Sequence, residues 1–279
     1  MKTRWVMMAV MVALSGMAQA AFVTIGNAGN AADTANGGIY GDVAYTYRIS
    51  ATEVTIAEFQ LATGAGDGDE NYWSGVGPNA PASYVSLYEA RKYCNWLTTG
   101  DVNRGYYGAS GQNMSGLSHD AYATANGLTY FLPTEDEWYK AAYYTGSSGD
   151  LWSLYANGTD TVPTWGTTDG WNYYNGAFVN GSPNYTWTTG FGGEEQNGTY
   201  DMMGNVWEWM EASSGVIRGG SYGDVESYLR SSFRSFPDPS LEHDSLGFRV
   251  VAIPEPATAL ILALGGAVIG LYRRFFGRV

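Results

Sequence analysis

The sequence predicts a loop-rich α+β fold in a single domain. Its 279 residues include 38 Gly, 22 Tyr and 10 Trp, and only short stretches carry the period of a helix or a strand. Residues 100–127 and 146–197 show neither period but contain many aromatic residues. We therefore expect burial of Tyr and Trp side chains, rather than regular structure, to order these loops.

Helical patterns occur at three places. In residues 86–97, apolar positions recur at i, i+3, i+7 and i+10, which form one face of a helix. A second helix begins at Thr134, which makes the capping-box pattern with Glu137. A third helix is predicted over residues 55–61. Because Cys94 lies on the apolar face of the first helix, we predict a buried structural thiol there.

Short strands fit residues 43–49, 216–219 and 247–253, where β-branched and aromatic residues are frequent. A loop rich in Ser, Pro and Asp separates the last two. The chain shows no internal repeat, and its one linker is the junction directly before Pro254. Because about 230 residues suit one domain, we assign residues 21–252 to a single folded unit.

The N-terminus has the pattern of a secretory signal peptide. Lys2 and Arg4 precede a short apolar run, and Ala18, Gln19 and Ala20 form an A-x-A cleavage site. We assign residues 1–20 to a signal peptide that is cleaved after Ala20. A buried first helix is the alternative interpretation.

Residues 253–279 form a second distinctive end. Pro254, Glu255 and Pro256 precede an apolar run shorter than the roughly 20 residues of a spanning helix, and arginines follow it. The arginines would stay on the cytoplasmic side, which indicates a transient membrane anchor. This order also resembles the PEP-CTERM sorting signal, and the resemblance implies recognition and cleavage by an exosortase. A permanent single-pass anchor is the alternative.

The charge of the chain limits its partners. The formal net charge is −13 at pH 7, and basic residues at both ends leave the domain between them more acidic still. Such a surface repels nucleic acid and anionic lipid and attracts cations. We therefore expect no nucleic-acid partner. The single cysteine excludes an intramolecular disulfide, and the domain is large enough to bury a core without one.

Six motifs follow one another in the order found in one known family. They are ATEVTIAEF, CNWL, LPTEDEW, GNVWEW at residues 204–209, RGGSY at residues 218–222 and LGFRVV at residues 246–251. In this order they resemble the formylglycine-generating enzyme (sulfatase-modifying factor) family. The resemblance implies a variant of the C-type lectin-like fold, with little regular structure and a small antiparallel sheet.

Enzymes of that family oxidise a sulfatase cysteine with a copper ion held by two cysteines. Soft thiolates suit Cu(I), but here Asp224 and Leu229 stand at the two positions, although Ser221 persists. We therefore expect neither copper nor formylglycine-generating activity. A related branch uses three histidines, whereas this chain has only His119 and His243, and both are expected in loops or on the surface.

The stretch YDMMGNVWEW offers oxygen ligands for a hard cation. Asp201 and Glu208 supply carboxylates, and Gly204 and Val206 can supply carbonyls from the turn between them. The resemblance assigns these four residues to a family calcium site, so a structural calcium ion is expected. The alternative is a buried Glu208 satisfied by backbone amides, with the tryptophans in the core.

The resemblance implies a second calcium site upstream. Asn172 and Tyr173, in GWNYYNGAF, match its first ligands. The remaining ligands would fall near Asn180 and Ser182, where the loop lengths differ from those of the family.

Residues 223–245 would line the family's substrate groove. Four residues of this region, together with Ser221 just before it, are candidates for contact with a ligand: Asp224, Tyr228, Arg230 and Arg234. The two arginines, together with the aromatic side chains around them, could hold a peptide or a glycan. The alternative is that both arginines pair with nearby acids.

Two functions remain open. The first is a non-catalytic domain that is exported through the inner membrane of a Gram-negative bacterium and reaches the cell surface or the medium. It would bind extracellular polysaccharide or an envelope protein. The second is an enzyme, either a formylglycine generator with a displaced metal site or a diverged oxidoreductase. The missing cysteine pair disfavours the second.

Overall fold

The computed structural model describes residues 21–254, with gaps at residues 36–38, 63, 65, 67–69, 113, 147–150, 167–168, 182–184 and 213. The signal peptide predicted for residues 1–20 lies outside the described residues. Nearly all of the sorting segment predicted for residues 253–279 does too. Within the described part, no helix combines the length and the apolar character needed to cross a bilayer.

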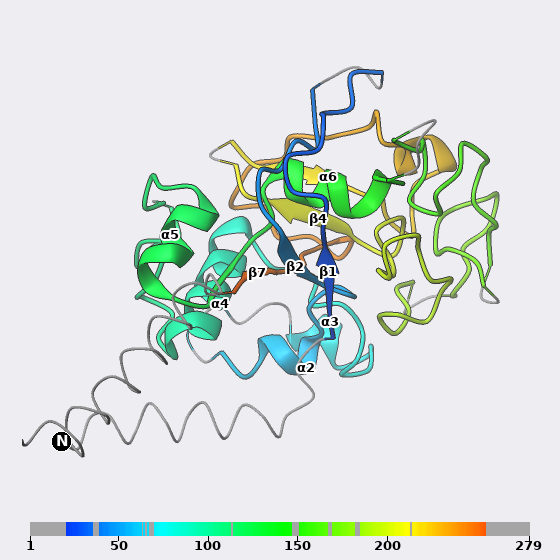
Figure 1. Ribbon diagram of the computed structural model, residues 1–279. Helices are drawn as coiled ribbons and strands as arrows, with labels where there is room; N and C mark the ends of the chain where they lie inside the picture. The colour runs from blue at the N-terminus through cyan, green and yellow to red at the C-terminus, as the bar shows by residue number, and fades with distance from the viewer. Residues whose placement is uncertain are drawn as a thin grey trace, which may run out of the picture.

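A four-stranded antiparallel sheet joins the two ends of the domain (Figure 1). Its strands lie in the order β1 (Phe22–Ile25), β2 (Tyr47–Ser50), β7 (Val251–Ile253) and β3 (Thr129–Phe131). Ile49 pairs with both Val23 and Val251, and Tyr130 pairs with Ala252. Because β7 lies between β2 and β3, the last strand of the described residues completes the sheet.

A smaller sheet holds the GNVWEW motif. Its strands lie in the order β5 (Val216–Arg218), β4 (Trp207–Met210) and β6 (Leu246–Gly247). β4 runs antiparallel to β5 and parallel to β6, so the expected antiparallel sheet is in fact two sheets with one parallel pair. All four residues of β4 are buried, which places Glu208 in the core.

The helices are short, and three of them begin at side-chain caps. They are α2 (Ile56–Phe59), α3 (Glu70–Trp73), α4 (Leu87–Thr99), α5 (His119–Asn126), α6 (Glu135–Tyr143) and the 3-10 helix η1 (Glu226–Leu229). Complete capping boxes open α4 at Ser86 and α6 at Thr134. Gly100 ends α4 in the left-handed conformation with φ 75°. The buried thiol predicted for Cys94 is confirmed.

Three details of the sequence prediction are wrong. The strand expected over residues 247–253 is interrupted, because the carbonyls of Phe248 and Val250 accept hydrogen bonds from the backbone N–H groups of Val54 and Ser50 as the chain passes between the sheets. The strand expected over residues 43–49 begins only at Tyr47. Helix α5 lies inside the loop expected over residues 100–127, where only two of its eight residues are buried and the apolar pattern is therefore weak.

Aromatic side chains order the long loops, as expected. Tyr155, Trp171 and Trp187 lie in segments without regular structure and are nearly fully buried. Figure 1 shows this part of the chain as successive loops on the side of the molecule away from α5. In the core beneath, the indole of Trp209 donates to the carbonyl of Val85. Burial of rings thus replaces hydrogen-bonded ladders over a large part of the chain.

Candidate functional site

Glu208 is fully buried in β4, and side chains satisfy its carboxylate. Arg249 donates to both carboxylate oxygens, from Nε at 2.7 Å and from Nη2 at 2.6 Å. The indole Nε1 of Trp138, on α6, donates to the same carboxylate at 2.7 Å. The alternative of a buried, satisfied Glu208 therefore describes the structure, but with side-chain donors in place of backbone amides.

Arg249 also holds three backbone segments together. Its remaining N–H groups donate to the carbonyls of Ser50, Ala51 and Tyr200. One planar guanidinium thus joins the end of β2, the loop before β4, and β4 itself. A permanently charged fork with five donors suits this role.

Asp201 lies at the start of the same turn, in a conformation with φ 58°. Its two carboxylate oxygens accept hydrogen bonds from the indole of Trp187 at 2.9 Å and from the backbone N–H of Gly190 at 2.7 Å. Burial raises the pKa of Asp201 to about 6. Asp201 therefore anchors the loop that carries Trp187 and Gly190.

Two further buried acids surround this pair. Burial raises the pKa of Glu195 to about 8 and raises the pKa of Glu53 well above its usual range. One oxygen of Glu53 accepts from the Asn205 amide at 2.9 Å, whereas the other is buried with no hydrogen-bond partner in the described part of the chain. Since one guanidinium faces several carboxyl groups, we infer that Glu53 and Glu195 hold protons at neutral pH.

Asp201 and Glu208 do not fit a calcium ion as they are arranged. Each of their four oxygens already accepts an N–H group, and calcium at Glu208 would have to displace Arg249. Within the described ranges, no three residues among His, Cys, Asp and Glu are grouped to hold a metal. Of the two predicted carbonyl donors, Val206 is buried, and Gly204 sits where a Cβ would meet the Asn172 carbonyl at 2.3 Å.

The close approach of Gly204 brings the two predicted calcium sites together at Asn172. The Asn172 side-chain amide donates to Tyr185 and to Asn205, and its Oδ1 is buried without a donor from the described residues. The Tyr173 carbonyl accepts the indole N–H of Trp165. An unpartnered oxygen of this kind fits a cation, so the second predicted site has one suitable ligand in place.

Of the remaining candidates of the second site, the structure describes only Asn180. Asn180 donates its amide to the carbonyl of Thr186 at 3.0 Å. Ser182 lies outside the described residues.

The two positions of the family's copper ligands have structural roles here. Asp224 accepts hydrogen bonds from the Ser221 hydroxyl at 2.6 Å and from the Ser221 backbone N–H at 3.0 Å. Leu229 is fully buried and lies over Gly220. Asp224 thus closes a turn and Leu229 fills the core, and neither is a soft ligand for Cu(I).

The predicted groove arginines pair with neighbours, in part as the alternative interpretation held. Arg234 donates to Glu135 at 2.7 Å and to the Tyr40 hydroxyl at 2.7 Å, so it pairs with an acid. Arg230 instead donates to the hydroxyl of Tyr155 at 3.0 Å. Tyr228 is exposed and contacts Trp207 and Phe233.

A cluster of aromatic rings beside Ser221 was not singled out from the sequence. We call it the Tyr222 surface, and it comprises Tyr72, Tyr84, Tyr174, Phe178, Tyr185 and Tyr222. Tyr185 stacks on Tyr222 with ring centroids 5.4 Å apart, and Phe178 lies 4.5 Å from Tyr185. The rings come from helix α3 and three separate loops, so no local pattern could reveal them. The large number of tyrosines was the one available signal.

Known proteins support the resemblance to the formylglycine-generating enzyme family. The model of the family described as "Sulfatase-modifying factor enzyme 1-like domain" matches residues 42–253. The chain belongs to this family. Two solved structures share the fold of this sulfatase-modifying factor domain. Their sequence identities to it are low, so the likeness shows the fold and not a shared function.

The first is the "Crystal Structure of CarF", with 20% identity and a TM-score of 0.58, which covers 86% of this chain and 100% of that chain. The second, "Treponema denticola variable protein 1", has 21% identity and a TM-score of 0.53, and covers 84% and 95% of the two chains. Together with the family match, they support the C-type lectin-like fold.

His119 of this sulfatase-modifying factor domain is buried, so its expected place on the surface is wrong. Its Nδ1 lies 3.0 Å from Glu137, and its Nε2 lies 2.9 Å from Glu211. Burial alone would lower the pKa of His119, but the two carboxylates outweigh it and raise the pKa to about 10. The ring stacks on Phe131, so a charged imidazolium links α5, α6 and the end of β4. His243, in contrast, is exposed as expected.

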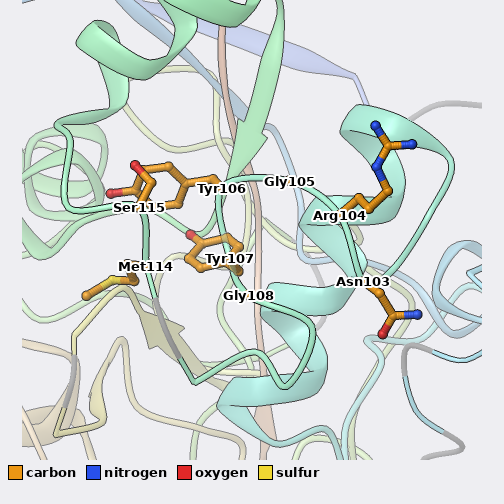
Figure 2. A pocket seen from close by; sticks show the side chains of 8 residues that line it. All are labelled: Asn103, Arg104, Gly105, Tyr106, Tyr107, Gly108, Met114 and Ser115. Carbon is orange, nitrogen blue, oxygen red and sulfur yellow. The ribbon is translucent and has the colours of Figure 1, made fainter.

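An open pocket of ≈ 430 Å³ lies beside this histidine network (Figure 2). It is lined by Asn103, Arg104, Gly105, Tyr106, Tyr107, Gly108, Met114 and Ser115. The hydroxyls of Tyr106 and Tyr107 both donate to Glu211, the partner of His119. None of the residues predicted to bind a metal or a ligand lines this pocket.

Proposed function

We propose that this protein is an exported, non-catalytic sulfatase-modifying factor domain that binds a ligand through the Tyr222 surface. The observation that carries the proposal is that Asp224 and Leu229, and not cysteines, occupy the two positions of the family's copper ligands. Asp224 is held in a turn by Ser221, and Leu229 is buried in the core. The single cysteine of the chain, Cys94, is also buried. The family's oxidative chemistry therefore lacks its ligands.

The same region retains the features of a binding surface. Phe178 and Tyr228 expose 42% and 37% of their area on either side of the Ser221 turn in sequence. Tyr174 is positioned directly by that turn, because its N–H donates to the Asp224 carbonyl at 2.8 Å. Amphipathic, rigid rings of this kind give contact area at low entropic cost. We propose an extracellular polysaccharide or an envelope protein as the ligand.

Export and calcium complete the proposal. The signal peptide directs secretion, and an exosortase processes the C-terminal sorting segment, which anchors the protein transiently in the membrane before it reaches the cell surface or the medium. Calcium, where it binds, is structural and uses the unpartnered Oδ1 of Asn172. In that case calcium should raise the melting temperature of the wild-type protein, and Asn172→Ala should abolish the effect.

Co-sedimentation of the mature protein with the exopolysaccharide of the producing cell tests the binding function. We expect saturable binding that Phe178→Ala weakens and that Phe191→Ala, a substitution of another exposed ring, leaves unchanged. The same assay with envelope proteins covers the other ligand class. Absence of binding to either material would contradict the proposal.

A separate assay tests the absence of catalysis. Incubation with copper, oxygen and a cysteine-bearing sulfatase peptide should yield no aldehyde by mass spectrometry. Turnover above a copper-only control would instead support the alternative function, an oxidoreductase with a displaced metal site.

A further inference from the structure

We propose, on the basis of the proposed function, that the Tyr222 surface recognises a positively charged protein segment through its lysine or arginine side chains. Three observations lead to this ligand class: the arrangement of the rings, the strained backbone of one tyrosine, and the charge around them.

The rings form one continuous array. Tyr174 lies 5.1 Å from Phe178, Phe178 lies 4.5 Å from Tyr185, and Tyr185 stacks on Tyr222 at an interplanar angle of 13°. Tyr222 itself is buried, whereas Phe178 is 42% exposed. The array therefore has a fixed base and an open outer ring, and the faces of such rings carry the negative part of the aromatic quadrupole.

Tyr84 lies near Tyr222 in a strained backbone conformation. Its φ is +54°, which is rare for a bulky residue, whereas the other non-glycine residues with positive φ in the described part of the chain are all Asn or Asp. A hydrogen bond from its N–H to the His243 carbonyl holds it there, and its ring lies 5.1 Å from that of Tyr72. Strain of this kind persists where a function needs the side chain in one place.

The carboxylate of Asp244 accompanies these rings. Asp244 forms a hydrogen bond with Tyr222 and lies 2.9 Å from Nδ1 of the exposed His243, and the backbone carbonyl of Asp224 accepts the N–H of Tyr174. Within the described ranges, no guanidinium or ammonium group stacks on the rings of Tyr174, Phe178, Tyr185 or Tyr222. Arginines lie instead over rings elsewhere, for example Arg234 over Phe236 and Arg230 over Tyr155.

Aromatic rings beside a carboxylate favour a positively charged ligand. Aromatic faces next to carboxylates attract lysine and arginine side chains by cation–π and Coulomb interactions. The net charge of −13 adds long-range attraction for a basic partner and repels an anionic polymer. Of the two ligand classes in the proposed function, the chemistry thus favours a basic envelope protein over an acidic polysaccharide.

The test uses the mature protein and three synthetic peptides of equal length that are rich in lysine, in glutamate, or in serine and glycine. Isothermal titration calorimetry at low and high salt gives the affinities. We expect the lysine-rich peptide alone to bind, more weakly at high salt. Phe178→Ala and Asp244→Asn should each weaken binding about tenfold, which corresponds to roughly 1.4 kcal/mol.

Matched controls separate site binding from general attraction. Phe191→Ala removes another exposed ring, and Asp238→Asn removes another carboxylate, and both should bind the peptide like the wild type. Equal losses in all four variants would overturn the inference. Binding of a neutral oligosaccharide without the peptide would also overturn it but keep the proposed function. Binding of neither probe, nor of any exopolysaccharide, would count against both.

Discussion

At the scale of single residues, the structure relies on two buried charges that compensate buried acids. Arg249 pairs with Glu208, and the imidazolium of His119 pairs with Glu137 and Glu211. A buried pair adds little when compared with an apolar pair. Removal of one member, however, leaves an uncompensated charge in a medium of low polarity. These residues therefore tolerate substitution poorly, although none of them contacts a ligand in our proposals.

We expect Arg249→Met to lower the free energy of unfolding by about 3–5 kcal/mol, because it leaves Glu208 buried without its partner. Urea unfolding followed by tryptophan fluorescence measures the change. Arg234→Met is the matched control, since Arg234 is 28% exposed and its partner Glu135 is 16% exposed. Its loss should be about 0–1 kcal/mol, as for surface ion pairs. Similar losses in both variants would refute the distinction.

The protonated imidazole of His119 contributes to the free energy of unfolding over a defined pH range. The folded pKa of about 10 lies above the ordinary value of 6.5, so the folded state holds its proton longer than the unfolded state does. The contribution is complete below about pH 6.5 and is lost as the pH rises through about 10. The free energies of unfolding of the wild type and of His119→Gln should therefore converge between neutral pH and pH 10. A constant difference would contradict the charged state.

At the scale of elements, local side-chain caps start the helices. The hydroxyl of Ser86 accepts from the Glu89 backbone N–H, and the Glu89 carboxylate accepts from the Ser86 backbone N–H at 2.8 Å. Thr134 and Glu137 repeat this arrangement at α6. Ser118 precedes α5 but makes no cap hydrogen bond. The three N-caps therefore form a natural comparison.

Ser86→Ala and Thr134→Ala should each destabilise the domain by about 1 kcal/mol, because each leaves a helix N–H without its acceptor. Ser118→Ala should have a smaller effect, since that hydroxyl bonds to Asp120 and not to the helix backbone. Thermal or urea unfolding of the three variants checks the order. An equal or larger effect at Ser118 would disprove the capping explanation.

At the scale of the whole molecule, acids exceed bases both on the surface and in the core. Glu53, Glu195, Asp201 and Glu208 are all buried, with Arg249 as the cation that pairs with Glu208. Burial raises the pKa of Asp201 to about 6 and that of Glu195 to about 8. Because the folded state then binds more protons than the unfolded state at neutral pH, stability should fall as the pH rises.

We expect the free energy of unfolding to decrease from about pH 5 to pH 8, as the raised carboxyl groups lose their protons. Glu195→Gln and Asp201→Asn should each flatten this decrease, because a neutral amide does not titrate. Asp238→Asn, at a fully exposed site, should leave the slope unchanged. Unfolding curves at several pH values give the slopes, and identical slopes in all variants would contradict the role of the buried acids.

The sequence by itself determined the features that depend on short-range order. The capping box at Thr134, the apolar helix face with Cys94, and the absence of a thiolate pair after GGSY are readable within a few residues, and the motif order indicated the family. The tertiary structure decided the rest. Arg249 meets Glu208 across 41 residues, and Glu211 meets His119 across 92 residues.

The Tyr222 surface likewise brings together rings from α3 and from separate loops, and no sequence periodicity connects these segments. Local patterns report only the conformation of a short segment, whereas the partner of a buried charge or ring depends on where distant loops pack. That is why Glu208 could be assigned to calcium from the sequence, and why only the folded chain placed Arg249 on its carboxylate.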